Sequence, residues 1–283
     1  MTMDPGPRVL AGRQLAAAIR AEAAAEAAAL TKAGRQPRLA VVTATGDGGS
    51  AAYVRSIANA AAKEGIACDV ARTTTVAGII AALTQLADDP EVHGVILQTP
   101  LPDGANLAAL ATAIPPAKDI DGASPESLGR LAAGLPSFAP ATAEAVLALL
   151  DHYQVELRGR HAVVVGRSVV VGKPAAHLLL DRHATVTICH SRTVDLAAIT
   201  RQADVLVAAV GRAGLIGPGH VSPGTTVIDV GTNAAPDGGL VGDVDPAVAD
   251  VEGVALTPVP GGVGPVTTAL LLRHVVTAAA TPG

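Results

Sequence analysis

Segments with helical and with strand-like hydrophobic patterns alternate from one end of the chain to the other. The first helix is predicted over residues 13–32, where most positions are Ala, Glu, Leu or Arg, the residues with the strongest helix propensity. Short apolar runs bounded by turn-forming residues predict buried strands. The predicted strands are 39–45, 66–71, 92–98, 161–165, 185–189, 205–210 and 226–230, and the further helices are 50–64, 75–87, 141–153, 172–181, 196–202 and 267–280. Strands that alternate with helices predict an α/β fold with parallel sheets and helices on both faces.

The segment 122–140 interrupts this alternation. It shows little periodicity and has Gly or Pro at 122, 125, 129, 134, 136 and 140. We interpret it as the approach to a domain boundary, because 283 residues at about 150 per domain fit two domains. The pattern therefore predicts two α/β domains.

Composition and charge exclude several classes of protein. The formal net charge of −5 argues against a sequence-independent nucleic-acid binder, which needs an excess of Lys and Arg. The two cysteines, Cys68 and Cys189, cannot build a disulfide framework or a cysteine-rich zinc site, and the histidines show no metal-ligand spacing. Neither a signal pattern at residues 1–10 nor a stretch of about 18 apolar residues is found, so we expect a cytoplasmic protein without a metal or a membrane contact.

A buried strand followed by a glycine turn and a helix lies at 161–181. Gly166 and Gly172 flank the turn, and Pro174 stands in the first turn of the helix, where it loses no hydrogen bond. Such a junction directs backbone N–H groups and the positive helix end at a phosphate. The spacing differs from the Rossmann Gly-x-Gly-x-x-Gly, and an ordinary βα turn also carries two glycines, so both interpretations stay open at this point.

The next predicted strand favours a dinucleotide with a 2′-phosphate. An NAD site places a carboxylate at the tip of this strand, where it binds the ribose 2′-hydroxyl. Here the tip reads His190, Ser191, Arg192 and Thr193, without an acid. Together with Arg167, these donors suit NADP, although each residue alone is also typical of a solvated loop end.

Six segments resemble the bifunctional methylenetetrahydrofolate dehydrogenase/methenyltetrahydrofolate cyclohydrolase family over nearly the whole chain. They are 94–102 (GVILQTPLP), 118–122 (KDIDG), 166–174 (GRSVVVGKP), 189–193 (CHSRT), 227–231 (VIDVG) and 257–265 (TPVPGGVGP). The resemblance implies two domains that flank a cleft: a folate domain, 1–140 with 267–283, onto which the last helix packs, and a Rossmann-like NADP domain, 141–266. It also implies a homodimer that oxidises 5,10-methylenetetrahydrofolate with NADP and hydrolyses the methenyl product to 10-formyltetrahydrofolate.

The resemblance carries site residues over to matching positions. Tyr53, Gln98 and Asp121 are implied as catalytic, and the substrate-binding set adds Ser50, Pro100, Gly262 and Pro265. The cofactor-binding set is Gly166, Arg167, Ser168, Gly172, Ser191, Arg192 and Thr232. Without the resemblance, Tyr53 would be an ordinary helix residue, Gln98 a strand cap and Asp121 a turn-former before Gly122.

The family's catalytic motif is Tyr-x-x-x-Lys, and here it reads Tyr53-Val54-Arg55-Ser56-Ile57. Residues four apart share a helix face, so Ile57 replaces the amine that would meet Tyr53 and Gln98. Hydride transfer needs mainly orientation, whereas hydrolysis needs a proton carrier. We therefore predict that dehydrogenase activity survives and that the cyclohydrolase step is weak or absent. The alternatives are the full bifunctional enzyme, with another group in place of the amine, and a folate- and NADP-binding protein without turnover.

Other departures from the family pattern cluster on the folate side. They are Thr99, Ala123, Ser124, Ser127 and the run 141–143, where the family usually has other residues. Two interpretations fit: a folate pocket that has changed toward a related one-carbon substrate, and tolerated changes in a housekeeping enzyme.

Overall fold

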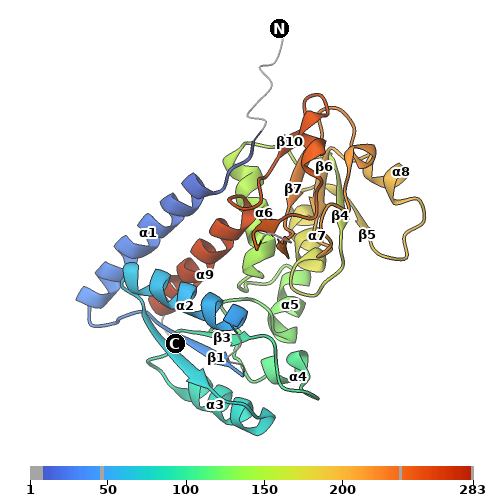
Figure 1. The fold of residues 1–283 in the computed structure, drawn as a ribbon. Helices are drawn as coiled ribbons and strands as arrows, with labels where there is room; N and C mark the ends of the chain where they lie inside the picture. The colour runs from blue at the N-terminus through green and yellow to red at the C-terminus, as the bar shows by residue number, and fades with distance from the viewer. Residues whose placement is uncertain (1–8, 45–47, 236–237, 282–283) are drawn as a thin grey trace. The chain divides into compact units, whose positions relative to one another are not determined.

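The computed structural model describes residues 9–44, 48–235 and 238–281. The chain divides into two compact units. Unit 1 contains residues 1–16 and 142–267, and unit 2 contains residues 17–141 and 268–283. Each unit has its own parallel sheet, which confirms the predicted α/β class (Figure 1).

The sheet of unit 2 has three parallel strands in the order β2-β1-β3. The strands are β1 (Arg38–Thr43), β2 (Ala67–Arg72) and β3 (Gly94–Gln98), and the helices are α2 (Gly48–Lys63), α3 (Val76–Asp88), α4 (Leu107–Ala111) and α5 (Pro125–Ala132), with most of α1 (Arg13–Lys32). In β1, every residue from Leu39 to Thr43 is buried, as expected for a central strand covered on both faces. Ile79 and Leu83 of α3 pack against this sheet.

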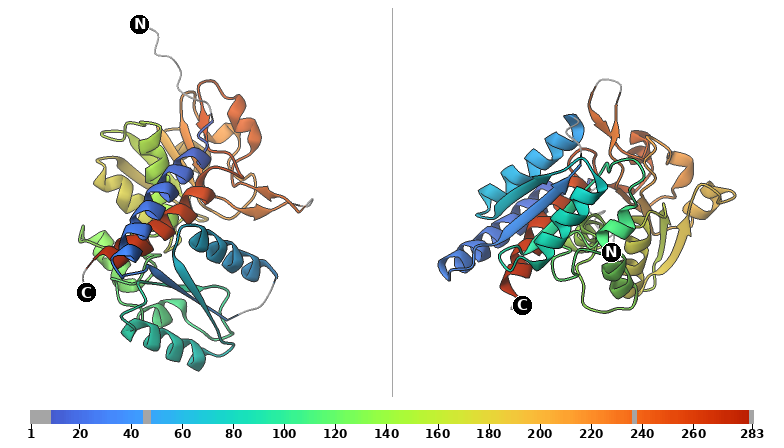
Figure 2. Two further views of the ribbon diagram at one scale, coloured as in Figure 1. Left: turned by 90° about the vertical axis from the view of Figure 1, so that its left-hand side faces the viewer. Right: turned by 90° about the horizontal axis from the view of Figure 1, so that it is seen from below.

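The last helix, α9 (Val263–Ala280), contributes residues 268–280 to unit 2. These turns run beside residues 17–32 of α1 in all three ribbon views (Figures 1 and 2). By length and composition α9 could cross a membrane, so the expectation that no such stretch exists was wrong. Leu270, Leu272 and Val276 are fully buried, however, which is typical of the core helix of a globular unit.

Unit 1 has five parallel strands in the order β10-β7-β6-β4-β5. The strands are β4 (His161–Val165), β5 (Thr185–Cys189), β6 (Val205–Ala208), β7 (Thr226–Asp229) and β10 (Ala255–Leu256), and the helices are α6 (Ala141–His152), α7 (Gly172–Asp181) and α8 (Leu196–Thr200). Short 3₁₀ turns cover 218–220 and 246–250, and β8 (Asn233–Ala234) pairs antiparallel with β9 (Leu240–Val241). After β5 the chain returns to the other side of β4, so the sheet has its topological switch point beside β4.

The structure departs from the predicted elements mainly at short segments. The segment 122–140, interpreted as the approach to a domain boundary and assigned no helix, contains α5, which Ser124 caps by accepting the N–H of Ser127 at 3.1 Å. Helix α2 begins at Gly48, two residues before the predicted start at residue 50, so residues 48–49, which the sequence predicts as part of a turn at 46–49, are helical. Residues 46–47 of that turn lie outside the described residues. Helix α9 starts four residues early because Gly264 and Pro265 fit its first turn.

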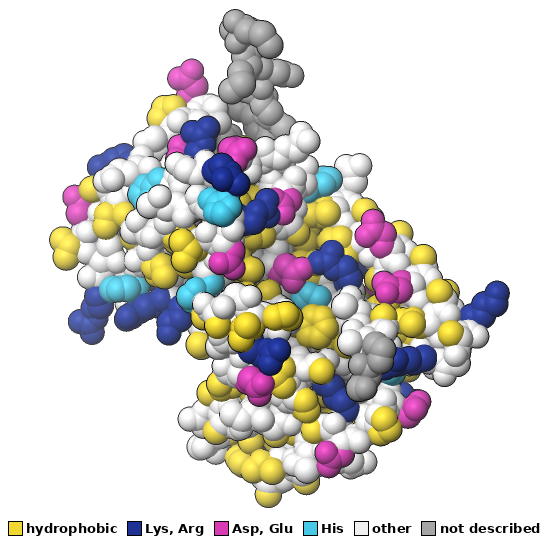
Figure 3. All heavy atoms as spheres, turned by 180° about the vertical axis from the view of Figure 1, so that it is seen from behind, with side chains coloured by type: hydrophobic (Ala, Val, Ile, Leu, Met, Phe, Trp, Pro, Cys, Tyr) yellow, Lys and Arg dark blue, Asp and Glu magenta, His cyan; other side chains and the backbone are white. Residues whose placement is uncertain are grey.

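Charged side chains of both signs are spread over the surface. On the face that Figure 3 draws, the described Lys and Arg side chains lie among Asp and Glu side chains and hydrophobic ones. The formal net charge of −5 is therefore not gathered into one acidic region on that face.

Candidate active site

In unit 2, the predicted folate residues follow the carboxyl end of the sheet. Gln98 is the last residue of β3 and pairs in register with Thr43 of β1; its side-chain amide donates to the carbonyl of Thr99 at 2.8 Å. Tyr53 lies on α2 and is 41% exposed. Carboxyl ends of parallel strands are where α/β folds bind ligands, so the position of Gln98 fits a substrate contact.

Asp121 and Tyr53 are electrostatically coupled. Burial, followed by the negative charge of Asp121, raises the pKa of the Tyr53 hydroxyl to about 12. Burial, followed by the charge of Asp119, raises the pKa of the Asp121 carboxyl to about 7, while His274 acts in the opposite direction. The structure therefore brings these two predicted site residues together, with a carboxyl group that can exchange a proton near neutral pH.

Two buried neighbours of Asp121 were missed by sequence reasoning. The Asp119 carboxylate accepts the N–H groups of Ala123 at 3.2 Å and Ser124 at 2.8 Å, which fixes the turn after Asp121. The imidazole Nδ1 of His274, on α9, lies 2.7 Å from the Ile120 carbonyl. A histidine inside an otherwise apolar helix was the available signal for this contact.

Ile57 is only 1% exposed and lies one turn beyond Tyr53 on α2. Its side chain is among the largest that are fully buried. Position 57 thus holds an apolar group inside the unit, and a charged amine there would be taken out of water.

For the remaining predicted substrate residues, the structure gives the position in the chain and few contacts. Ser50 belongs to the first turn of α2, but its side chain lies outside what the structure describes. Pro100 follows a cis peptide bond after Thr99 and is exposed. Gly262 and Pro265 belong to unit 1, at the start of α9, where the Gly262 N–H donates to the Pro258 carbonyl at 2.8 Å.

In unit 1, the glycine turn after β4 is built as the sequence predicts. Gly166 has φ +131°, and a Cβ there would lie 2.1 Å from the Ala209 carbonyl oxygen, so only glycine fits. A Cβ on Gly172 would lie 2.2 Å from the Gly166 carbonyl oxygen. The Ser168 hydroxyl accepts the Gly172 N–H at 3.2 Å, and Val171 offers no side-chain cap to α7. This close turn against a helix N-terminus suits a phosphate group.

The predicted cations of the cofactor half lie on neighbouring strands. Val165 and Cys189 are paired in register, so Arg167 follows the end of β4 while Ser191 and Arg192 follow the end of β5. All three residues are exposed. His190 holds the turn at the tip of β5 with two hydrogen bonds. Its N–H donates to the Thr193 hydroxyl at 2.8 Å, and its Nδ1 accepts the Arg192 N–H at 3.1 Å. Two guanidinium groups and a hydroxyl at one sheet edge suit a 2′-phosphate.

A pair of buried carboxylates, also missed from the sequence, holds the loops after β6 and β7. Asp243 accepts the N–H groups of residues 210, 211 and 212 at 2.6, 3.0 and 2.9 Å and the Asn233 side-chain amide at 2.9 Å. Asp229 accepts the N–H of Gly231 at 2.9 Å. Thr232 is exposed between two residues that these carboxylates hold. An acid at the end of a buried strand was the only sequence signal for this network.

Two family models cover this chain. The catalytic domain of tetrahydrofolate dehydrogenase/cyclohydrolase matches residues 10–121, and the NAD(P)-binding domain of the same enzyme matches residues 140–282. The chain belongs to the tetrahydrofolate dehydrogenase/cyclohydrolase family. The resemblance seen in the sequence is thereby confirmed, and the NAD(P)-binding domain confirms the predicted nicotinamide dinucleotide cofactor.

Individual members of this family are similar over nearly their whole length. A protein of Rhodococcus jostii named "Bifunctional protein FolD 1" is 60% identical over 97% of this chain and 93% of its own. A FolD methylenetetrahydrofolate dehydrogenase/cyclohydrolase structure from Campylobacter jejuni superposes with a TM-score of 0.93 at 38% identity, covering 96% of this chain and 98% of that one. The Trypanosoma brucei FolD, solved with NADP and an inhibitor, gives a TM-score of 0.90 at 37% identity, covering 96% and 97% of the two chains.

These comparisons bear on the alternatives left open by the sequence. The relatives are named as bifunctional enzymes, which fits the full dehydrogenase/cyclohydrolase better than a weak or absent cyclohydrolase step. They also favour an enzyme over a binding protein without turnover.

Proposed function

We propose that this chain oxidises 5,10-methylenetetrahydrofolate with NADP and then hydrolyses the methenyl product to 10-formyltetrahydrofolate. The observation that carries the proposal is the match of both family domains to this chain, supported by Gln98 at the carboxyl end of β3 and by the electrostatic coupling of Tyr53 with Asp121. NADP supplies the hydride acceptor when it is bound.

Residues of each half have separate roles in this proposal. Asp121 accepts the N–H groups of the pterin, and Gln98 orients the folate with its amide. Tyr53 closes the site beside the reacting bridge. In unit 1, Gly166, Ser168 and Gly172 receive the phosphates, and Arg167, Ser191 and Arg192 select the 2′-phosphate. In this proposal Ser50, Pro100, Gly262 and Pro265 contact the folate, and Thr232 contacts the cofactor.

For hydrolysis, Asp121 is our candidate for the group that replaces an amine at position 57. A carboxyl with a pKa of about 7 is close to the value at which a proton carrier is most effective at neutral pH. Water adds to the methenyl carbon, and Asp121 receives a proton that this water releases. The bond from that carbon to N5 then breaks, N5 takes one proton, the formyl group stays on N10, and the second proton of the water leaves to solvent.

Ile57 favours a second candidate function, a dehydrogenase with weak hydrolysis. Its buried butyl group cannot carry a proton, and a positioned acid–base group contributes about 10²–10⁴-fold to such a step. The two candidates predict the same first reaction and differ in the second.

One assay tests both functions. Purified protein is mixed with methylenetetrahydrofolate and NADP, and NADPH formation and methenyl decay are followed separately. We expect NADPH to form and the methenyl product to decay faster than in buffer; decay at the buffer rate favours the second candidate. Absence of NADPH at every cofactor concentration refutes both and leaves a binding protein.

We further propose that residues 1–140 with 267–283 carry the folate, that residues 141–266 carry the cofactor, and that the protein is a cytoplasmic homodimer. A single peak at twice the chain mass of 27.9 kDa in sedimentation analysis is expected. A monomer peak contradicts this assignment.

A further inference from the structure

A second cavity lies in unit 2, at the opposite end of the sheet from the folate residues. It has a volume of about 840 Å³ and is lined by residues before β1 and β3, by the 115–118 segment and by α5 with the turn that follows it. His93 precedes β3 and Gln98 ends it, a separation of about 16 Å at 3.3 Å per residue. The cavity is therefore separated from the folate residue Gln98 by the length of β3.

The floor of this cavity is apolar and firmly held. Pro90, Pro115, Pro116 and Pro136 contribute to it, and none of them offers an N–H group. The Phe138 ring forms a further wall and packs on the His274 ring, with 4.8 Å between the ring centroids. A surface of this kind favours the apolar body of a small molecule.

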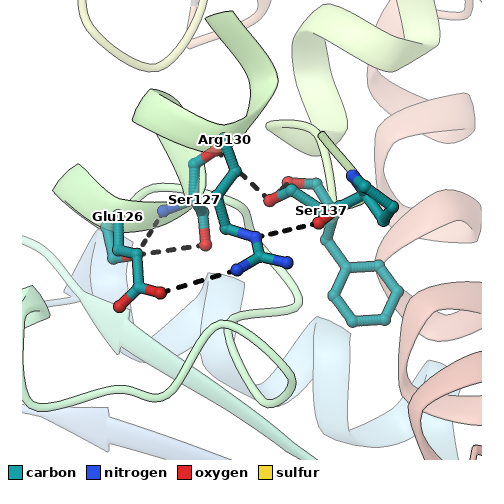
Figure 4. Close-up of polar contacts among 7 residues, drawn as sticks. Glu126, Ser127, Arg130 and Ser137 are labelled. Atoms are coloured by element: carbon teal, nitrogen blue, oxygen red, sulfur yellow. Dashed lines mark hydrogen bonds and ion pairs between the residues drawn. The ribbon is translucent and has the colours of Figure 1, made fainter. Parts of the chain in front are cut away.

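Main-chain oxygens accept hydrogen bonds from the two arginine side chains at the cavity, and one exposed carboxylate, Glu126, lies beside Arg130. The Arg35 guanidinium donates to the Thr281 carbonyl at 2.8 Å, and Arg130 donates through Nε to the Pro136 carbonyl at 3.0 Å. Figure 4 shows Arg130 between Glu126 on α5 and the turn that carries Ser137. Glu126, 3.8 Å from Arg130 and 63% exposed, is a weak partner. Among the described residues, no carboxylate forms an ion pair with Arg35.

The other cations at this cavity differ from the two arginines. The Lys118 ammonium donates to the carbonyls of Leu86, Ala87 and Asp89 at 3.0, 2.8 and 2.6 Å, so its hydrogen-bonding capacity is used at the end of α3. Acidic residues beside α3, Asp88 and Asp89, offset its charge. Arg35 and Arg130 thus remain as the guanidinium groups available to a ligand.

His93 is a buried hydrogen-bond donor at the cavity, and nearby positive charges lower its pKa. It is 7% exposed, and its Nδ1 accepts the Arg38 N–H at 3.2 Å, so the neutral ring carries its proton on Nε2. Burial, then the charge of Arg35, lowers the pKa of His93, and Lys118 and Arg38 act in the same direction against Glu91. The ring is therefore neutral at pH 7 and can donate a hydrogen bond to an anion.

We propose that this cavity is a second ligand site, which binds a small organic carboxylate with an aromatic or aliphatic body. The apolar floor receives the body, and the guanidinium groups of Arg35 and Arg130 receive the carboxylate, for which their planar donors are suited. This site goes beyond the proposed folate and NADP reactions and uses none of their residues.

Binding of 2-naphthoate to the full-length protein, measured by calorimetry, tests the site. We expect 2-naphthoate to bind and the neutral 2-naphthalenemethanol to bind at least fivefold more weakly. Arg35→Gln and Arg130→Gln should each weaken 2-naphthoate binding about fivefold, or about 1 kcal/mol, as expected for a partly exposed ion pair. The matched control is Arg160→Gln, since Arg160 also forms a weak ion pair, at 3.9 Å from Asp204.

Three results would overturn the proposal. The first is an absence of 2-naphthoate binding at millimolar concentrations, and the second is equal binding by the wild type and both arginine variants. The third is loss of binding in Asp121→Ala but not in the arginine variants, which would place the probe in the folate half. Dehydrogenase kcat/KM should stay within about twofold in the arginine variants, which shows that they are folded and separates this test from that of the proposed function.

Discussion

Replacement of Ile57 by lysine separates the two steps of the proposed reaction. Because Ile57 is 1% exposed, the new amine enters a buried position one turn from Tyr53. Desolvation lowers the pKa of a buried lysine, which makes it a proton carrier near neutral pH. The second candidate function, with weak hydrolysis, predicts that Ile57→Lys accelerates methenyl hydrolysis by about 10²–10⁴-fold, the usual contribution of a positioned acid–base group. The full activity that we propose, with Asp121 as the proton carrier, predicts little change in that rate.

The same substitution has a cost in stability that can be worked out from the burial. The lysine stem replaces most of the apolar contacts of isoleucine, but the amine loses its hydration. We expect the free energy of unfolding to fall by about 2–4 kcal/mol. For a protein of this size, that corresponds to a decrease in Tm of about 5–15 °C.

The assay compares methenyl decay and NADPH formation in wild type, Ile57→Lys and Ile57→Met. The methionine variant keeps an apolar side chain of similar volume without an amine, so its decay rate should equal that of the wild type. If Ile57→Lys hydrolyses the methenyl product no faster than Ile57→Met, an amine at position 57 is not what the second step needs. Fast decay in the wild type that Ile57→Lys leaves unchanged leads to the same conclusion and favours Asp121 as the proton carrier.

Further predictions concern the cofactor-binding residues and Glu64, which directly follows α2. Arg192→Ala should lower kcat/KM for NADP about 10–100-fold and leave that for NAD unchanged, because only NADP has the 2′-phosphate; steady-state kinetics with both cofactors check this. Asp243→Asn should raise the KM for NADP at least about tenfold without changing the KM for folate, since an amide cannot accept all three loop N–H groups. Burial raises the pKa of Glu64 to about 7, so the folded protein holds this proton more tightly than the unfolded chain. The stability gained from this proton is present below about pH 4 and is lost as the pH rises through about 7. Urea titrations should therefore show Glu64→Gln more stable than wild type by up to about 3 kcal/mol at pH 9. At pH 5 the two proteins should differ little.

The elements that the sequence predicted best have strong local signals. Helix α1 and the run β4-α7-β5 have the predicted bounds. The alanine-rich α1 lies between Gly12 and Gly34, the β-branched β4 ends before Gly166, and α7 begins at Gly172. Helix α5 was missed because it has only eight residues and contains Gly129, so that its start is marked chiefly by a cap, Ser124 before Pro125. Short elements such as α4 and β8 carry too few residues for any period to be seen.

The residues of the candidate site also differ in whether a local sequence pattern marks them. Tyr53, Gln98 and the Gly166 turn could be named as candidates because motifs of fixed spacing contain them. The Asp229–Asp243 network was not found, since its members are 14 residues apart and meet only through the fold. The contact of His274 with the Ile120 carbonyl spans 154 positions, a distance over which no local pattern carries information.

If residues 190–193 at the tip of β5 select NADP as proposed, cofactor preference can be changed without altering the rest of unit 1. Its two hydrogen bonds, from the His190 N–H to Thr193 and from the Arg192 N–H to His190, both lie within residues 190–193. The carboxylates of Asp229 and Asp243 hold other loops and make no hydrogen bond to this one among the described residues. Replacing residues 190–193 with a tetrapeptide that ends in an acidic residue would thus shift the preference from NADP to NAD. The buried residues of unit 1 would be unchanged.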